Sequence, residues 1–171
     1  MSCVVKRCSF QWVNLAPMRA KIQPGHCFEW QYVIPARATV PELYHDTAFC
    51  RDMPAVLATG YLVGMMELAC LHGLMPFMDW PHEQSLGTMV NFRHLAPSSP
   101  GMTLSVRGEV LEVEGRRLLF RVEAWDEVEK VCEGTHERFL IDPARFAGKM
   151  AHKQVRRAGA PANPAMQPDE R

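Results

Sequence analysis

Apolar and polar side chains alternate along five stretches of the chain, as they do in β-strands with one buried face. In the first stretch, Phe28 and Trp30 fall on one side and Glu29 falls on the other. Glu114 and Gly115 mark a tight turn after the third stretch, and Asp126 to Lys130 mark one after the fourth. The pattern predicts strands at 27–34, 87–95, 102–113, 117–125 and 131–141.

A long apolar segment interrupts this alternation. The 26 residues from Met53 to Met78 contain one charged side chain, Glu67. Their length and composition predict an α-helix that is entered at residues 52–54, because Pro54 suits an early helical position, and that ends near Leu74. Since this helix is apolar on every side, we expect it to be buried inside a sheet or between subunits.

Two glycines fall inside the predicted helix. Gly60 and Gly64 each cost about 1 kcal/mol at a helix interior position. They indicate either close packing of another element against the helix backbone or simple tolerance of glycine.

The order of these elements predicts the fold class. One strand, a long apolar helix and then four antiparallel strands fit an α+β domain in which one sheet wraps around one helix, the hotdog fold. We expect a poorly ordered N-terminal extension over 1–22, this domain over 23–150, and a mobile tail rich in proline and alanine over 151–171.

The apolar segment is also long enough to cross a membrane. Val56 to Met78 spans 23 residues, but it contains Glu67 and His72. A carboxylate near the middle of a span costs roughly 2.5–3.5 kcal/mol, and the strands that follow need a helix to cover one face. The sequence therefore favours a core helix over a transmembrane one.

Composition and charge narrow the class of protein. The chain has 171 residues, of which 47% are hydrophobic, so one domain with a sizeable core is expected. Lysine plus arginine and aspartate plus glutamate number 19 each, which leaves no overall field to attract nucleic acid or an anionic membrane. The basic run over 149–157 is expected to solubilise the tail.

The six cysteines indicate a reducing compartment. They are scattered, with no CxxC pair and no cluster at zinc-ligand spacing. Residues 1–20 contain no continuous apolar stretch of the kind that a signal peptide needs. We expect a cytoplasmic protein with free thiols.

Glu67 is the first candidate for chemistry. A carboxylate among apolar residues either acquires polar partners or shifts its pKa upward. Thr59 lies eight positions earlier, which on a helix is about 80° beyond two full turns, so both side chains can face one cleft. His94 follows in a strand, and together these residues offer a hydroxyl, a carboxylate and an imidazole for hydrolysis.

Four motifs in order identify a family resemblance. They are ATGYLVGMMELAC at 58–70, SLGTMVNFRHLAPSSPG at 85–101, VEGRRLLFRVEAWD at 113–126 and EGTHERFLID at 133–142. Together they resemble the fluoroacetyl-CoA thioesterase family of hotdog enzymes, from about Gly25 onward. The resemblance implies hydrolysis of a short acyl-CoA at sites formed in a homodimer, with no cofactor beyond the coenzyme A of the substrate and no metal.

The resemblance also implies roles for individual residues. Thr59, Glu67 and His94 match the catalytic set of the family, and Gly87 matches a glycine that helps to hold the acyl carbonyl. Fluoroacetyl-specific members carry a pair of phenylalanines before the catalytic helix, where this chain has Cys50 and Met53. We therefore expect a different acyl selectivity and substrate-binding contacts from these two side chains.

Three arginines are candidates for binding the phosphates of coenzyme A. Arg116, Arg117 and Arg138, with the nearby His136, lie in the last two strands and the turn before them, and guanidinium groups suit phosphate oxygens. The competing interpretation is a solvated strand face.

Two other functions remain open at the level of sequence. A hotdog protein can bind an acyl-CoA without cleaving it, because fold alone does not decide function. A dehydratase acting on hydroxyacyl or enoyl thioesters would need an Asp/His pair that the sequence does not show in the expected context. The Thr59, Glu67 and His94 set favours hydrolysis.

Overall fold

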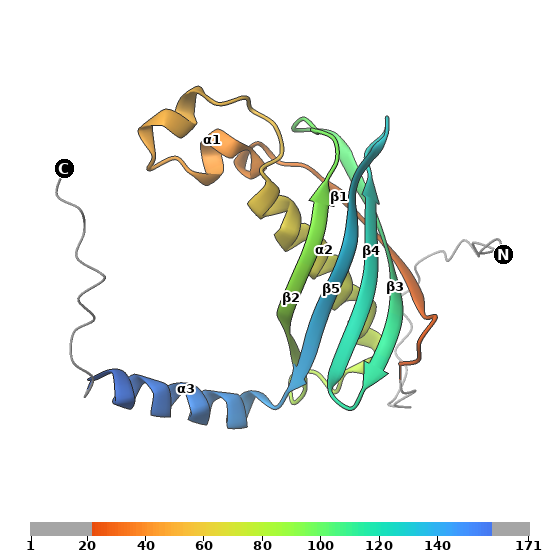
Figure 1. The fold of residues 1–171 in the computed structure, drawn as a ribbon, viewed down its shortest axis with the longest axis vertical. Coiled ribbons are helices and arrows are strands. Elements are labelled where there is room, and N and C mark those ends of the chain that lie inside the picture. The colour runs from red at the N-terminus through yellow and green to blue at the C-terminus, as the bar shows by residue number, and fades with distance from the viewer. Residues whose placement is uncertain (1–21, 159–171) are drawn as a thin grey trace.

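One antiparallel sheet wraps around one long helix. The computed structural model describes residues 22–158 (Figure 1). The five strands are β1 (Cys27–Val33), β2 (Gln84–His94), β3 (Thr103–Glu114), β4 (Arg117–Trp125) and β5 (Lys130–Ile141). Their order in the sheet is β1-β3-β4-β5-β2, so β1 and β2 are the edges. The helices are α1 (Val40–Leu43), α2 (Thr59–Leu74) and α3 (Pro143–Ala158), with 3₁₀ turns η1 (Ala36–Ala38), η2 (Ala48–Asp52) and η3 (Met75–Phe77).

The predicted α+β hotdog architecture is confirmed, and each predicted strand is present to within three residues at either end. The start of the helix was predicted too early, because α2 begins at Thr59. Before it, the Leu57 amide donates to the Ser98 carbonyl and the Ala58 amide donates to the Ala38 carbonyl. These bonds hold the chain extended until α2 begins.

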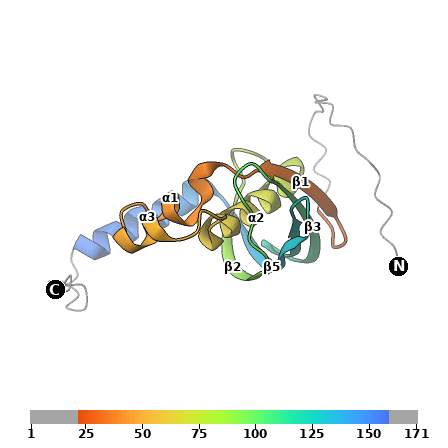
Figure 2. The ribbon, with the colours of Figure 1, turned by 90° about the horizontal axis from the view of Figure 1, so that it is seen from above.

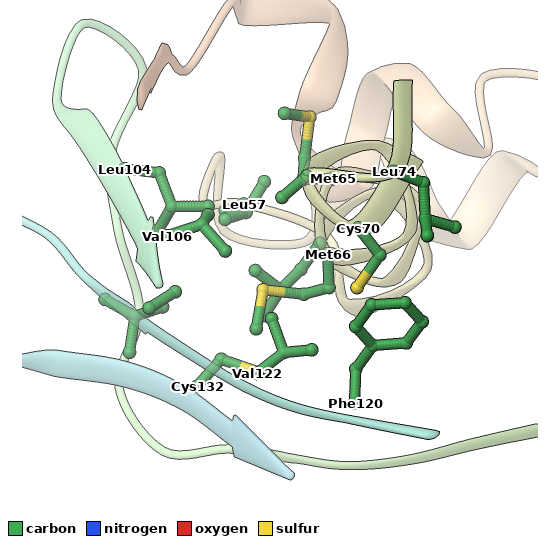
Figure 3. Packing of buried hydrophobic residues seen from close by; sticks show 14 of the residues in the cluster. Leu57, Met65, Met66, Cys70, Leu74, Leu104, Val106, Phe120, Val122 and Cys132 are labelled. Carbon is green, nitrogen blue, oxygen red and sulfur yellow. The ribbon is translucent and has the colours of Figure 1, made fainter. Parts of the chain in front are cut away.

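The core lies between α2 and the concave face of the sheet (Figure 3). The inward positions of β3 and β4 alternate with exposed ones, as the sequence pattern predicts, and fully bury Leu104, Val110 and Phe120. From the helix, Met66 and Cys70 enter the same cluster with no exposed surface. Burying large apolar side chains contributes roughly 1.5–3 kcal/mol each, so this contact fixes the position of α2.

The opposite face of α2 is uncovered in the single chain. Gly60, Gly64 and Leu68 are exposed although the helix has almost no polar residues. The lid segment over residues 36–53 covers part of Gly60, where an added Cβ would lie 3.3 Å from the Tyr44 hydroxyl. At Gly64 an added Cβ would meet nothing within 4 Å. Burial inside one chain therefore accounts for only part of the apolar surface of this helix.

The C-terminal helix α3 was not predicted. Its first turn is capped by Asp142, whose Oδ1 accepts hydrogen bonds from the Ala144 and Arg145 amides, and Pro143 follows the cap. The first residues of the predicted tail, 151–158, belong to this helix. The rest of that tail and residues 1–21 of the predicted extension lie outside the described residues.

Two arms extend from the same side of the domain. Figures 1 and 2 show that α3 and the segment containing α1 both project beyond β2 and α2, at opposite ends of the sheet. Within residues 22–158, no helix has the length and apolar character needed to cross a bilayer.

Gly73 gives a test of how tightly β1 closes on the helix. Alanine at this position would place its Cβ 2.5–2.9 Å from three ring atoms of Phe28. Gly73→Ala is expected to lower the free energy of unfolding by about 1–3 kcal/mol, because the ring cannot shift without disturbing the core. Urea unfolding measures the change. Gly148→Ala is the matched control, since its Cβ would meet nothing within 4 Å, and equal stability of the two variants would contradict the packing.

Candidate functional site

Thr59 and His94 come together across the end of the sheet. Thr59 is the first residue of α2, and His94 is the last residue of β2. The core packing of α2 brings these two ends within reach, and Thr59 Oγ1 lies 3.0 Å from His94 Nδ1 in a hydrogen bond. A hydroxyl and an imidazole in this contact can exchange or orient a proton.

The environment of His94 favours its neutral form. Burial lowers the pKa of the imidazole below its ordinary value, and a backbone interaction at Ala96 opposes this in part. Its second nitrogen, Nε2, is buried and has no hydrogen-bond partner among residues 22–158. A neutral imidazole is the form that can accept a proton near neutral pH.

A small cavity opens beside this pair, with a volume of about 200 Å³. This is below the roughly 300–1,000 Å³ of sites that hold drug-sized ligands, so it suits a small group. The cavity is lined by Thr59, Leu62, Val63, Val90, Asn91, Phe92, His94 and Cys132. The predictions included Thr59 and His94 from this lining and missed the rest.

Glu67 lies apart from this cavity, two turns further along α2. Its side chain retains 38% exposure, so the expected burial of this carboxylate is wrong for the single chain. The partners of Glu67 lie on the sheet. His136 Nε2 is 3.6 Å from Glu67 Oε1, and a Cβ added at Gly87 would overlap the same oxygen. The absence of a side chain at Gly87 therefore lets the carboxylate approach β2 closely.

A buried network of polar groups on β2 and β5 supports Glu67. The Nδ1 of His136 donates to the Met89 carbonyl at 2.8 Å, so its Nε2 accepts from the Arg138 guanidinium at 3.2 Å. Arg138 also donates to the Glu67 carbonyl and to both the hydroxyl and the carbonyl of Ser85. Burial lowers the pKa of His136, which agrees with this neutral tautomer.

This network corrects the prediction for Arg138. The side chain is 6% exposed and its donors are engaged inside the protein, so it is not placed to bind a phosphate in solvent. His136 has no exposed surface and is likewise excluded from that role. The sequence carried a signal for this network, because both residues occupy inward positions of a strand where the pattern calls for apolar side chains.

The other two predicted phosphate contacts, Arg117 and Arg116, differ in whether their charge is already paired. Arg117 forms ion pairs with Glu112, Glu114 and Glu137, which neutralise its charge within the sheet. Arg116 is exposed in the turn between β3 and β4. Arg116 thus keeps the exposure that a phosphate contact requires, and Arg117 is engaged elsewhere.

Cys50 and Met53 lie in and just after η2, in the lid segment near the start of α2 (Figure 1). Cys50 is 7% exposed and Met53 is 44% exposed, whereas the neighbouring Phe49 is 74% exposed. The lid therefore turns the small thiol inward and the aromatic ring outward. Residues 22–158 contain no group of three or more His, Cys, Asp or Glu side chains arranged to hold a metal ion.

Comparison with known protein families shows which family this chain belongs to. The family of fluoroacetyl-CoA-specific thioesterases matches residues 42–144, which hold most of the lid segment, α2 and strands β2 to β5. The chain belongs to this family. It is therefore a thioester hydrolase, and the alternative of a binding protein without activity is set aside.

Individual relatives agree with this assignment. The fluoroacetyl-CoA thioesterase of Streptantibioticus cattleyicolor is 40% identical over 136 residues, covering 80% of this chain and 97% of the relative. A structure of the fluoroacetyl-CoA thioesterase FlK matches with a TM-score of 0.74 at 40% identity, over 78% of this chain and 98% of that one.

A more distant member of the thioesterase superfamily, from Thermus thermophilus, matches with a TM-score of 0.70 at 28% identity. It covers 82% of this chain and 99% of that chain. The family match ends at residue 144, so α3 lies almost wholly beyond it.

Gly87 gives a test of the contact between Glu67 and the sheet. Gly87→Ala is expected to displace the Glu67 carboxylate, because the atom that the new Cβ overlaps most is the end of a flexible side chain. The His136 ring, whose Cε1 would lie 3.0 Å away, needs to shift by only a few tenths of an ångström, so the fold should persist. A displacement of about 1 Å can cost about 100-fold in rate, so kcat should fall by that order. Steady-state thiol release measures it.

Val33→Ala on the opposite edge strand, β1, is the control for Gly87→Ala, since Val33 is 60% exposed. It should leave kcat within a few-fold of the wild type. A wild-type kcat for Gly87→Ala, with unchanged stability, would show that the approach of Glu67 to β2 does not matter for the reaction.

Proposed function

We propose that this protein hydrolyses a small acyl-CoA to a free acid and coenzyme A, using Thr59, Glu67 and His94. The Glu67 carboxylate attacks the thioester carbonyl or activates a water that does so. Thr59 orients the reacting group, His94 accepts and returns the proton, and backbone N–H groups near Gly87 stabilise the oxyanion. Coenzyme A leaves as a thiol, and the reaction needs no other cofactor.

The observation that carries this proposal is the Thr59–His94 hydrogen bond at the mouth of a small cavity. The cavity of about 200 Å³ has room for a short acyl group and not for a long chain. The apolar side chains around it, such as Leu62 and Val63, suit a hydrocarbon substituent.

A homodimer would complete this site. The edge strand β2 exposes Leu86, Met89 and Val90 by 36–42%, and exposed apolar edge strands are open to pairing with another chain. The bare face of α2 lies beside it, with nothing above Gly64. We propose that two copies pair through β2 and α2 about a two-fold axis, which would bury both surfaces.

This two-fold axis would bring Glu67 into the active site. If two α2 helices cross antiparallel at Gly64, Glu67 lies three positions after the crossing point. It therefore lies near residues 59–61 of the other helix, which are three to five positions before that point. Glu67 of one copy then faces the Thr59–His94 pair of the other, although the two groups are separated within one chain. Each active site would thus draw on both subunits.

The lid supports an acyl selectivity different from that of fluoroacetyl-specific relatives. Cys50 and Met53 stand in place of two aromatic rings, and methionine is flexible and fills irregular space. We propose that the protein does not discriminate strongly for fluorine. Cys50, Cys70 and Cys132 are free thiols, which fits the proposed cytoplasmic location.

Release of free thiol tests the reaction and its selectivity together. Acetyl-, propionyl-, phenylacetyl- and fluoroacetyl-CoA are compared for the wild type and for Glu67→Gln. We expect comparable kcat/KM for acetyl- and fluoroacetyl-CoA, and a loss of at least about 100-fold in Glu67→Gln, because the amide can neither attack nor accept a proton.

Glu129→Gln in the exposed turn between β4 and β5 is the matched control for the loss of a carboxylate. It should retain wild-type rates. A preference of several orders of magnitude for fluoroacetyl-CoA would overturn the selectivity, and full activity in Glu67→Gln would overturn the mechanism.

Gly64→Leu tests the dimer. Within one chain the new side chain meets no neighbour at its Cβ and improves helix propensity, so the fold should persist. Between two helices it would force the backbones apart, so the dimer should dissociate and activity should fall with it. Sedimentation velocity measures the mass. Arg121→Leu on the exposed side of β4 adds the same side chain elsewhere and should leave the mass unchanged; a dimeric Gly64→Leu would contradict the arrangement.

A further inference from the structure

Helix α3 concentrates the positive charge of the chain. It carries five lysines and arginines and no acidic residue, namely Arg145, Lys149, Lys153, Arg156 and Arg157. Because the whole chain has a net charge of zero, the other residues together carry a formal charge of −5. None of the five cations forms an ion pair within residues 22–158, in contrast to Arg107, Arg121 and Lys130 on the sheet. The helix therefore presents cations that are available for an anionic ligand.

The position of α3 follows from the sheet. It begins directly after Ile141, which pairs with Gln84 at the start of β2. His94 is at the other end of that strand, and 11 residues of strand span roughly 35 Å. Within one chain, α3 thus starts at the end of β2 that is remote from the Thr59–His94 pair.

In the proposed dimer, by contrast, α3 of one copy starts close to the Thr59–His94 pair of the other. When identical strands pair antiparallel about a two-fold axis through their middle, the start of each lies beside the end of the other. The Gln84 end of one β2 would lie beside the His94 end of the second copy. Helix α3 would then extend from the domain next to the partner's Thr59–His94 pair.

We propose that α3 of each subunit binds the phosphate groups of the coenzyme A held in the active site of its partner. This inference rests on the proposed dimeric thioesterase. Coenzyme A carries a diphosphate and a ribose phosphate, which are separated from the thioester by the long pantetheine arm. Their binding site must therefore lie away from Thr59, on an element that reaches beyond the catalytic cavity.

The chemistry of α3 fits this ligand. On a helical projection, Arg145, Lys149, His152 and Arg156 lie along one face, with Lys153 beside them, so several cations can meet one group of phosphates. The sheet arginines considered from sequence do not compete for this role, because Arg138 is buried and Arg117 is already paired.

A comparison of two substrates tests the proposal. Acetyl-CoA and acetyl-pantetheine share the thioester and differ in the phosphates. In Lys149→Gln/Lys153→Gln, the KM for acetyl-CoA should rise about 10-fold, with kcat unchanged, since two exposed charge contacts are lost. The KM for acetyl-pantetheine should not change. Arg107→Gln/Arg121→Gln removes two cations from the sheet surface and should leave both KM values unaltered.

A mixed dimer tests whether the helix acts on the other subunit. One chain carries His94→Ala with an intact α3, and the other carries Lys149→Gln/Lys153→Gln with an intact Thr59–His94 pair. The two chains bear different tags and are purified in tandem. Because the one functional pair is served by the intact α3 of its neighbour, the KM for acetyl-CoA should return to the wild-type value. A KM that stays raised would overturn action between subunits.

The remaining outcomes separate the competing explanations. Turnover of both thioesters with a KM for acetyl-CoA that is insensitive to the α3 variant would overturn the phosphate site and leave the thioesterase standing. If that variant instead lost binding to vesicles of phosphatidylglycerol and phosphatidylcholine, α3 would be a lipid contact and the proposal would be wrong. No turnover of either thioester by the wild type would overturn the thioesterase itself, and the α3 site with it.

Discussion

The structure depends on the burial of one face of α2 in the concave side of the sheet. This single contact orients the helix, and its orientation decides what the remaining residues can do. Thr59 is carried to the end of β2, where it meets His94 at 3.0 Å, and Glu67 is carried two turns further to the glycine of β2. Because Thr59 and Glu67 are eight residues apart on α2, they contact β2 at two separate places.

The polar network beneath Glu67 shows how such a position is maintained. Arg138 is buried, yet each side of its guanidinium has an acceptor, among them the Glu67 carbonyl and the oxygens of Ser85. Buried charges are tolerated when their donors are satisfied in this way. The network joins β2, β5 and α2, so the elements around the carboxylate are held as one unit.

The sequence predicted the strands and the core well because alternation reports directly on burial at positions such as Leu104 and Phe120. The family motifs located Thr59, Glu67 and His94, but could not show that Glu67 lies apart from the other two within one chain. That separation follows from the rise of the helix, about 12 Å over eight residues, which the facing angle used at the level of sequence does not report. Arg138 was misread because arginine is usually exposed, and its inward position in the alternating pattern of β5, which indicates burial, was not given weight. The start of α2 was predicted too early because tertiary hydrogen bonds delay it, and α3 was missed because the Asp142–Pro143 cap after the last strand was not recognised as a helix start.

The fixed tautomer of His136 makes the architecture sensitive to protons. Its Nε2 can accept from Arg138 while the ring is neutral. A proton there would break this bond and place two cations side by side, and the Glu67 carboxylate 3.6 Å away offsets this in part. Since burial lowers the pKa of His136 below its usual value of about 6.5, its contribution to stability is complete above that pH and is lost as the pH falls through the folded-state pKa. Acid would thus loosen the scaffold around Glu67 from within, so the stability of the enzyme at low pH depends on a buried residue outside the Thr59–His94 cavity.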